Sequence, residues 1–395
     1  MTARRIAFVV QRYGPEVSGG AETLCRQLAE HLSRYVDIDV LTTCAVEYER
    51  WANYYPAGRT QLNRVPVHRF VVDEPRDPRR FDEITLRVLN TAADLDTQLE
   101  WMRQQGPISS GLLRYIATHS KDYRAFVFFT YLYGTTFLGL PLVWDKALLI
   151  PAAHDEPTFY LDIFQSVFHL PRAIIYNTES ERRLTQRLFS NERIPCAVIG
   201  TGIDVPADVR GDRFRARYGL RGDFVIYVGR VDESKNVREL FDHFLAFRAR
   251  DSRQVKLVVI GKGSTPIPRH PDIVPLGFVS EQDKFDGLQA AAALILPSKY
   301  ESLSIVVLEA WRVGTPVLVN GDCEVMKDQC RLGQGGLWYQ SSEEFGVVLR
   351  ALLDQPGLRR RLAESGRAFA ETTYAWDRVE RSYLDILDRF DGRRA

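Results

Sequence analysis

The feature that most constrains this chain is a repeated alternation of short apolar runs with segments of helical periodicity. The first repeat begins with an apolar run at Ile6–Val10 and a glycine-containing loop at Gly14–Gly20. Leucines then recur every fourth residue, at Leu24, Leu28 and Leu32, which puts them on one face of an α-helix. Strands that alternate with helices predict a mainly parallel sheet covered on both faces. Further strands of this half are predicted at Ile38–Thr43, Phe126–Tyr133, Ala147–His154 and Ala173–Thr178.

A second set of apolar runs begins after a polar, arginine-rich stretch at Val205–Asp223. A chain of 395 residues exceeds what one ordinary hydrophobic core holds. The polar stretch is therefore the predicted domain boundary, and we expect two open α/β sheets in series. The strands predicted for the second half are Phe224–Arg230, Val255–Gly261, Ile273–Phe278, Ala293–Ser298 and Thr315–Asn320.

The composition is that of a soluble globular protein with balanced charge. The 52 basic side chains nearly cancel the 51 acidic ones, and a net charge of +1 argues against a nucleic-acid partner. The apolar run near the N-terminus is too short for a signal peptide, so we expect a cytoplasmic protein. The cysteines are odd in number and scattered, which indicates reduced thiols: Cys25, Cys44, Cys196, Cys323 and Cys330.

One stretch, Phe126–Trp144, carries no formal charge and is long enough to cross a membrane. Gly134, Gly139 and Pro141 interrupt it, and its first half is aromatic and β-branched. The favoured interpretation is a buried strand, with a membrane span as the alternative.

Ligands of open parallel sheets bind outside the carboxyl ends of the strands. Residues that follow the apolar runs are therefore the candidates for a functional site. They include Gly19, Gly20, His154, Gly229, Arg230, Gly261 and Glu301.

The most specific pattern is PSKYESLSIVVLEAW at Pro297–Trp311, in which Glu301 and Glu309 are eight positions apart. A helix that begins near Ser302 would bring both carboxylates to one side. It would also offer the backbone N–H groups of Ser302 and Leu303 to an anion or to sugar hydroxyls. The alternative is that Glu301 only complements a helix dipole and that Glu309 is a solvated helix position.

With these residues the chain resembles glycosyltransferase family 4, whose Glu-x7-Glu motif matches Glu301 and Glu309. Other motifs match the family in order along nearly the whole chain, which makes the resemblance far more specific than one motif would. They are VSGGAE at Val17–Glu22, GTGID at Gly200–Asp204, YVGRVDESKNV at Tyr227–Val237 and YAWDRVERSYLDIL near the C-terminus.

The resemblance implies the GT-B fold, with two Rossmann-like domains that face each other across a cleft. Residues 1–203 would form the acceptor-side domain and residues 204–372 the domain that binds the nucleotide-sugar donor. Residues 373–395 would form a helix that crosses back to the first domain.

The resemblance also implies roles for individual residues. Arg230 and Lys235 would bind the donor diphosphate and neutralise the leaving group, with ordinary surface cations as the alternative. Glu309 would bind the ribose, while Glu301 and His154 would contact the transferred sugar; His154 is otherwise an ordinary loop residue. The full donor-binding set is Gly19, Gly20, Gly229, Arg230, Lys235, Glu301, Ser302, Leu303 and Glu309, and the catalytic set is His154, Arg230, Lys235 and Glu301.

The reaction implied is a retaining transfer of a hexosyl-type sugar from a UDP or GDP sugar to a glycan, lipid-linked or small-molecule acceptor in bacterial polysaccharide or glycoconjugate biosynthesis. We expect no cofactor and no metal. His154, Asp155 and Glu156 are adjacent on a turn and do not easily converge on one ion. Asp37-Ile38-Asp39 is formally a D-x-D motif, but it lies at the beginning of a strand.

Two other functions fit the same architecture. One is another enzyme: a nucleotide-sugar epimerase, against which the Glu-x7-Glu motif argues, or a phosphorylase, for which no lysine context suggests a pyridoxal phosphate anchor. The other is a non-catalytic homologue that serves as a subunit or binding module. The intact Arg230, Lys235, Glu301 and Glu309 favour an active enzyme over that homologue.

The acceptor, the linkage formed and the oligomeric state stay open at this stage. The chain has ESLS at Glu301–Ser304 where many relatives have a glycine-rich turn, so the donor sugar is open as well. Residues 46–105 resemble nothing assignable. Their arginines form either a face for a peripheral membrane contact or an ordinary solvated surface, the favoured interpretation: Arg76, Arg79, Arg80, Arg87 and Arg103.

Overall fold

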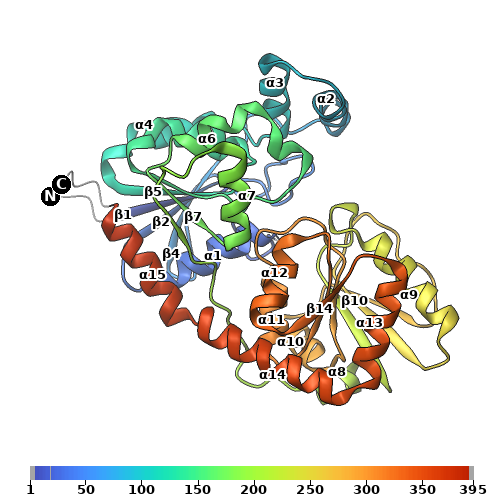
Figure 1. Ribbon diagram of the computed structural model, residues 1–395. Helices are drawn as coiled ribbons and strands as arrows, with labels where there is room; N and C mark the ends of the chain where they lie inside the picture. The colour runs from blue at the N-terminus through green and yellow to red at the C-terminus, as the bar shows by residue number, and fades with distance from the viewer. Residues whose placement is uncertain (1–4, 18, 391–395) are drawn as a thin grey trace. The chain divides into compact units, whose positions relative to one another are not determined.

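The computed structural model describes residues 5–17 and 19–390 (Figure 1). The chain divides into two compact units, the first made of Met1–Thr201 with Trp376–Ala395 and the second of Gly202–Ala375. Each unit is an α/β structure built on its own sheet. Ser18 of the predicted glycine loop and residues 391–395 of the expected C-terminal helix lie outside the described residues.

An eight-stranded sheet forms the centre of the first unit, in the order β3-β4-β2-β1-β5-β6-β7-β8. The pairings are parallel except that of β3 with β4, which is antiparallel. The predicted mainly parallel sheet is thus confirmed. The strands are β1 Arg5–Val9, β2 Ile38–Thr43, β3 Gly58–Leu62, β4 Val65–Phe70, β5 Tyr123–Phe129, β6 Ala147–Ile150, β7 Ala173–Tyr176 and β8 Cys196–Val198.

The central strands of this sheet are buried on both faces. Successive side chains of a strand point to opposite sides. Along β1, Ile6 and Phe8 enter one hydrophobic cluster, whereas Ala7 and Val9 enter another. The helices are α1 Gly20–Leu32, α2 Pro78–Asn90, α3 Leu95–Gln105, α4 Ser110–Thr118, α5 Gly134–Gly139, α6 Gln165–His169, α7 Glu179–Phe189 and α15 Trp376–Arg389, with short 3₁₀ helices η1 Ser120–Asp122, η2 Leu140–Lys146, η3 Pro157–Tyr160 and η4 Asp162–Phe164.

The last helix, α15, packs on α1 within the first unit. Its Tyr383 is buried and donates a hydrogen bond to the Gly200 carbonyl at 3.0 Å. Glu380 lies 2.7 Å from His31 Nδ1 and accepts a hydrogen bond from the Tyr35 hydroxyl at 2.8 Å. These polar contacts hold α15 to α1, to Tyr35 just after it and to the segment that follows β8.

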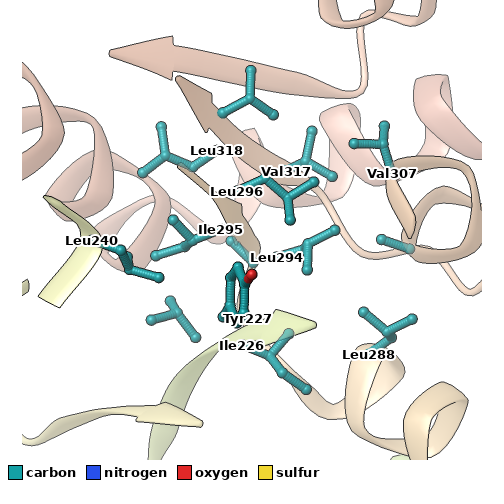
Figure 2. Close-up of a cluster of buried hydrophobic side chains, with 14 of the residues drawn as sticks. Ile226, Tyr227, Leu240, Leu288, Leu294, Ile295, Leu296, Val307, Val317 and Leu318 are labelled. Atoms are coloured by element: carbon teal, nitrogen blue, oxygen red, sulfur yellow. The ribbon is translucent and has the colours of Figure 1, made fainter. Parts of the chain in front are cut away.

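The second unit has a six-stranded sheet in the order β11-β10-β9-β12-β13-β14, and its strand pairings are parallel. Figure 2 shows the centre of its core, where Leu294, Ile295 and Leu296 of β12 lie between side chains of β9 and β13. Each such buried side chain contributes about 1.5–3 kcal/mol through loss of water contact. The strands are β9 Asp223–Val228, β10 Val255–Ile260, β11 Ile273–Gly277, β12 Leu294–Leu296, β13 Val317–Asn320 and β14 Gly336–Tyr339.

Local signals begin and end the helices of this unit. Ser280 and Ser341 cap α10 and α13 by accepting backbone N–H groups, and α8 ends at Gly219 in the left-handed conformation. The helices are α8 Gly211–Tyr218, α9 Val237–Arg250, α10 Glu281–Ala290, α11 Ile305–Arg312, α12 Glu324–Gly333, α13 Ser342–Asp354 and α14 Pro356–Thr373, with η5 Glu233–Lys235.

The predicted strands are present, although most end one to four residues earlier than expected. The reason is visible after β5 and β6, where Thr130 and Ala152 turn into the left-handed conformation, with φ of 60° and 48°. The uncharged stretch at Phe126–Trp144 is divided among β5, α5 and η2. Among the described residues, no helix is long and apolar enough to cross a membrane.

Candidate functional site

The second sheet has a topological switch point between β9 and β12. From β9 the chain continues to β10 and β11 on one side, whereas β12 leads to β13 and β14 on the other. The loops at the carboxyl ends therefore diverge at this point, and open α/β sheets bind ligands there. Arg230 and Lys235 follow β9 and Glu301 follows β12, so these three predicted residues border the switch point.

A tight backbone turn follows β9. Gly261, after β10, has φ +134°, and a Cβ there would lie 1.8 Å from the Gly229 carbonyl oxygen. The Tyr227 hydroxyl donates a hydrogen bond to the Arg230 carbonyl at 2.5 Å. The segment that carries Arg230 is therefore held from two sides.

The Arg230 side chain is oriented by two neighbours. Its Nη1 lies 3.5 Å from Asp232 Oδ2, and its Nη2 donates to Ser234 Oγ at 3.1 Å. Ser234 in turn donates to Asp232 at 2.6 Å. The guanidinium is one-third exposed, so it is fixed in direction and still reachable from solvent.

Lys235 and Glu301 join the segments that follow β9 and β12. Lys235 Nζ lies 2.7 Å from Glu301 Oε1, and the two side chains are 25% and 15% exposed. The same two segments are also joined by Asn236, whose side chain donates a hydrogen bond to the Pro297 carbonyl at 3.1 Å. A phosphate that entered here would compete with the Glu301 carboxylate for the Lys235 cation.

The predicted helix start near Ser302 is wrong. Helix α11 begins at Ile305 with Ser304 as its N-cap residue. Leu303, which precedes the helix, is 8% exposed and enters the core. The backbone N–H groups of Ser302 and Leu303 consequently do not belong to the first turn of α11, and Glu301 does not complement its dipole.

Glu309 is not a solvated helix position. Its side chain is 10% exposed, and Oε1 lies 2.8 Å from Lys284 Nζ on α10. Burial raises the pKa of Glu309, while Lys284 acts in the opposite direction. Burial also disfavours the charge on Lys284, but Glu309 and Glu281 outweigh it and the pKa of Lys284 is raised. The site thus contains a buried ion pair between α10 and α11.

The two predicted glycines of the first unit differ in their surroundings. A Cβ on Gly19 would lie 2.1 Å from Glu22 Oε2, and this carboxylate is buried and accepts from Gln11 at 2.8 Å and Arg12 at 2.9 Å. The packing of Glu22 alone therefore requires glycine at position 19. At Gly20, the first residue of α1, no atom lies within 4 Å of the position of a Cβ. Gly20 is exposed, so its packing does not require glycine.

His154 lies in the segment that follows β6. Its Nδ1 is 3.4 Å from Glu156 Oε1, and Glu156 accepts a hydrogen bond from Tyr131 at 2.8 Å. Asp155 accepts from the Tyr160 hydroxyl at 2.6 Å. Asp155 and Glu156 thus each accept a hydrogen bond from a tyrosine. In residues 5–17 and 19–390, no three His, Cys, Asp or Glu side chains are grouped to hold a metal ion.

The five arginines singled out in residues 46–105 do not all face solvent. Arg76 points inward and donates to the Gln104 carbonyl at 2.9 Å, and burial lowers its pKa to about 10. Arg80 and Arg103 both pair with Glu100, at 2.7 and 3.3 Å. The prediction that Arg76 lies on a solvated surface is wrong, because its guanidinium donates hydrogen bonds to the backbone carbonyls of Gln104 and Tyr48.

The D-x-D motif serves the interior of the first unit. Asp39 is buried, accepts from the Tyr123 hydroxyl at 2.8 Å and pairs with Arg5 at 3.1 Å. These contacts explain a carboxylate inside a parallel strand without a ligand.

Several polar residues of the second unit were not predicted. Asn320 ends β13 and donates to Glu239 at 2.9 Å, so the rule about carboxyl ends of strands would have found it. Lys284 lies within a helix, and no spacing or motif marks it. Ser298 follows β12 and is buried.

The predicted site residues are divided between the two units, and not all of those in the second unit are in contact. The structure brings Lys235 and Glu301 into contact and holds Arg230 in the neighbouring segment, whereas Glu309 pairs elsewhere, with Lys284. The first unit contains Gly19, Gly20 and His154; the second contains Gly229, Arg230, Lys235, Glu301, Ser302, Leu303 and Glu309.

Sequence comparisons find similarity in the same part of the chain. Residues 212–369 match the family model of glycosyl transferases group 1. The α-D-kanosaminyltransferase of Streptomyces kanamyceticus is 29% identical over 46% of this chain and 51% of its own length. The D-inositol 3-phosphate glycosyltransferase of Streptomyces avermitilis is 28% identical over 54% of this chain and 51% of its own length. The chain thus spans about half the length of these relatives.

Solved structures show the fold over nearly the whole chain. The sucrose-phosphate synthase of Thermosynechococcus elongatus superposes with a TM-score of 0.75 at 17% identity and covers 98% of each chain. HepE of Anabaena, solved in complex with UDP and glucose, gives a TM-score of 0.71 at 15% identity over 98% of this chain and 100% of its own. The chain therefore has the GT-B fold, with two Rossmann-like α/β units, and its second unit carries the sequence pattern of the group 1 glycosyltransferases.

Proposed function

We propose that this chain is a retaining, metal-independent glycosyltransferase of family 4. It transfers a hexosyl-type sugar from a UDP or GDP sugar to a glycan, a lipid-linked or a small-molecule acceptor, in the cytoplasm and for bacterial polysaccharide or glycoconjugate biosynthesis. The observation that carries the proposal is the ion pair of Lys235 with Glu301 at the switch point, beside the oriented Arg230. The match of residues 212–369 to the group 1 family supports it.

The ion pair suggests how the site accommodates a diphosphate. On binding, the Lys235 ammonium exchanges the Glu301 carboxylate for a phosphate oxygen, and Arg230 adds a second cation. The released Glu301 then accepts hydrogen bonds from hydroxyl groups of the sugar. A ligand with both a phosphate and hydroxyl groups thus satisfies each member of the pair, which a simple anion does not.

The remaining residues are assigned the roles that the resemblance to family 4 implies. Glu309, which pairs with Lys284, accepts hydrogen bonds from the ribose. Gly229 contributes backbone to the phosphate contacts, as do Gly20 and Gly19. His154 contacts the transferred sugar.

In the reaction, the bond between the anomeric carbon and the phosphate oxygen breaks, and a bond to the acceptor oxygen forms on the same face of the sugar. The acceptor proton passes to the departing phosphate oxygen. Charge therefore grows on the diphosphate as it leaves, and Arg230 and Lys235 lower the barrier by stabilising that charge.

Thermal unfolding with UDP, GDP, ADP, CMP and their common sugar conjugates tests the proposal. A ligand at about one hundred times its dissociation constant stabilises the native state by about 2.7 kcal/mol, which shifts the melting temperature measurably. We expect a shift with one nucleotide class, lost in Lys235→Ala. The matched control is Lys327→Ala, because Lys327 is also ion-paired in the second unit, with Glu324 of its own helix.

The opposite outcome is equally informative. If no nucleotide or nucleotide sugar shifts the unfolding of the wild-type protein, the chain is a non-catalytic GT-B homologue. A shift that survives in Lys235→Ala contradicts the assignment of the site.

A further inference from the structure

Glu181, in the first turn of α7, is fully buried and yet carries an ionisable group. Its Oε1 accepts the backbone N–H of Ala153 at 2.6 Å, and its Oε2 accepts that of Asn177, also at 2.6 Å. Ala153 follows β6 and Asn177 follows β7, and these strands are neighbours in the sheet. One carboxylate therefore ties together two segments at the carboxyl edge of the first sheet.

The segment that Glu181 holds contains a residue in an unfavourable conformation. Ala152 has φ +48°, in the left-handed region that side chains with a Cβ avoid. Such a residue persists only where its surroundings hold it, and these residues cluster at functional sites. The next N–H belongs to Ala153 and is bound by Glu181, and the residue after that is His154.

Burying an ionised carboxylate at this position costs free energy. Burial raises the pKa of Glu181 to about 8, although the backbone N–H groups of Asn177, Ala153 and Thr178 act in the opposite direction. A glutamine would avoid this cost, but it has one acceptor oxygen and would leave one backbone N–H unpaired. When ionised, the Glu181 carboxylate offers two acceptor oxygens to these two N–H groups on one side chain, which glutamine does not.

We infer that Glu181 is a positioning residue, which fixes the turn after β6 so that His154 is presented in one orientation. The inference rests on the proposed function, in which His154 contacts the transferred sugar. Glu181 is fully buried and thus acts through the Ala152–His154 turn instead of touching the ligand. Glu181 therefore affects binding of the donor sugar and not binding of the nucleotide.

The experiment compares binding of a nucleotide with binding of its sugar conjugate, by calorimetry at pH 8.5, where the Glu181 carboxyl is ionised. The ligands are UDP with UDP-glucose and GDP with GDP-mannose. The proteins are the wild type, Glu181→Gln, His154→Ala and the double variant. The matched control is Glu179→Gln, because Glu179 lies in the same turn of α7 but is 41% exposed and pairs with Arg182.

We expect His154→Ala to weaken binding of the sugar conjugate about 10-fold, with the nucleotide unchanged, as for the loss of one hydrogen bond. Glu181→Gln should weaken the conjugate about 3- to 10-fold, again with the nucleotide unchanged. The double variant should bind like His154→Ala alone, because Glu181 acts through His154. Losses that add, or a loss that includes the nucleotide, overturn the inference.

Hydrogen exchange gives a second measurement that needs no ligand. The Ala153 amide should exchange about 10-fold faster in Glu181→Gln than in the wild type or in Glu179→Gln. Equal rates overturn the inference. If Glu181→Gln does not fold, Glu181→Asp keeps the carboxylate but shortens its reach to the Ala153 and Asn177 N–H groups, and it should reduce conjugate binding in the same selective way.

The two measurements separate the inference from the proposed function. A wild-type protein that binds none of the four ligands contradicts the proposed function, whatever the exchange rates. A wild-type protein that binds them, with additive losses in the variants, contradicts only the role of Glu181.

Discussion

Lys284 on α10 and Glu309 on α11 form an ion pair of 2.8 Å in which both side chains are largely buried, at 14% and 10% exposure. A buried pair is costly to break from one side, because the remaining charge is left without a partner. The pair therefore makes the stability of the second unit depend on a residue that is also proposed to bind the donor ribose.

Glu309→Ala should consequently lower the free energy of unfolding by about 3–5 kcal/mol in urea denaturation. The double variant Lys284→Met with Glu309→Leu should recover most of this loss, because it removes both charges. Arg238→Ala is the control, since its pair with Glu233 is exposed and should be worth less than about 1 kcal/mol. A loss below 1 kcal/mol in Glu309→Ala would show that the pair is solvated.

Arg230→Ala should lower turnover with the preferred donor by about 100- to 1,000-fold, because a preorganised cation no longer stabilises the leaving diphosphate. The unfolding temperature should change little, since the side chain is one-third exposed. Steady-state kinetics with Arg230→Lys alongside tests whether charge alone suffices. Turnover near the wild-type rate in Arg230→Ala would refute its role.

Glu181 should make the protein less stable as the pH rises. Its pKa is raised from 4.5 to about 8 in the native state, so the native state holds a proton that the unfolded chain has already lost. This contribution to stability is complete below about pH 4.5 and disappears as the pH rises through 8. The neighbouring Tyr176 and Tyr383 stay neutral, because burial raises the pKa of each above the ordinary tyrosine value.

Urea denaturation at pH 5 and pH 8 measures the effect. The wild type should lose on the order of a few kcal/mol more than Glu181→Gln between these values, because glutamine does not titrate. A wild type and variant with parallel pH profiles would mean that the carboxyl keeps an ordinary pKa.

Gly261→Ala should disrupt the segment that carries Arg230. The new Cβ would lie 1.8 Å from the Gly229 carbonyl oxygen, so the segments after β9 and β10 would have to separate. We expect a loss of about 3 kcal/mol or more in unfolding free energy, and loss of nucleotide binding. Gly219→Ala is the control: it is also left-handed, with φ 64°, but its Cβ meets nothing within 4 Å, and it should cost about 1 kcal/mol.

Elements with a strong local pattern were predictable. The strand at Ile38–Thr43 is found with the predicted bounds, because six successive residues suit a strand that is buried on both faces. The helix with Leu24, Leu28 and Leu32 is also found, because the four-residue spacing of its leucines is visible within a short stretch of sequence. The β3–β4 hairpin was missed, because β3 is largely exposed and shows no apolar alternation.

Arg230, Lys235 and Glu301 could be placed after apolar runs, at the carboxyl ends of strands, from the sequence. The strand order that makes β9 and β12 neighbours at the switch point is a property of the folded sheet. Tertiary structure also decided the partners of the buried charges. Lys284 meets Glu309 from 25 positions away, and Glu181 meets Ala153 from 28, at distances that only the packed sheets and helices set. Spacing along a helix or strand describes neighbours within a few residues, whereas the partner of a buried charge depends on which elements pack against each other.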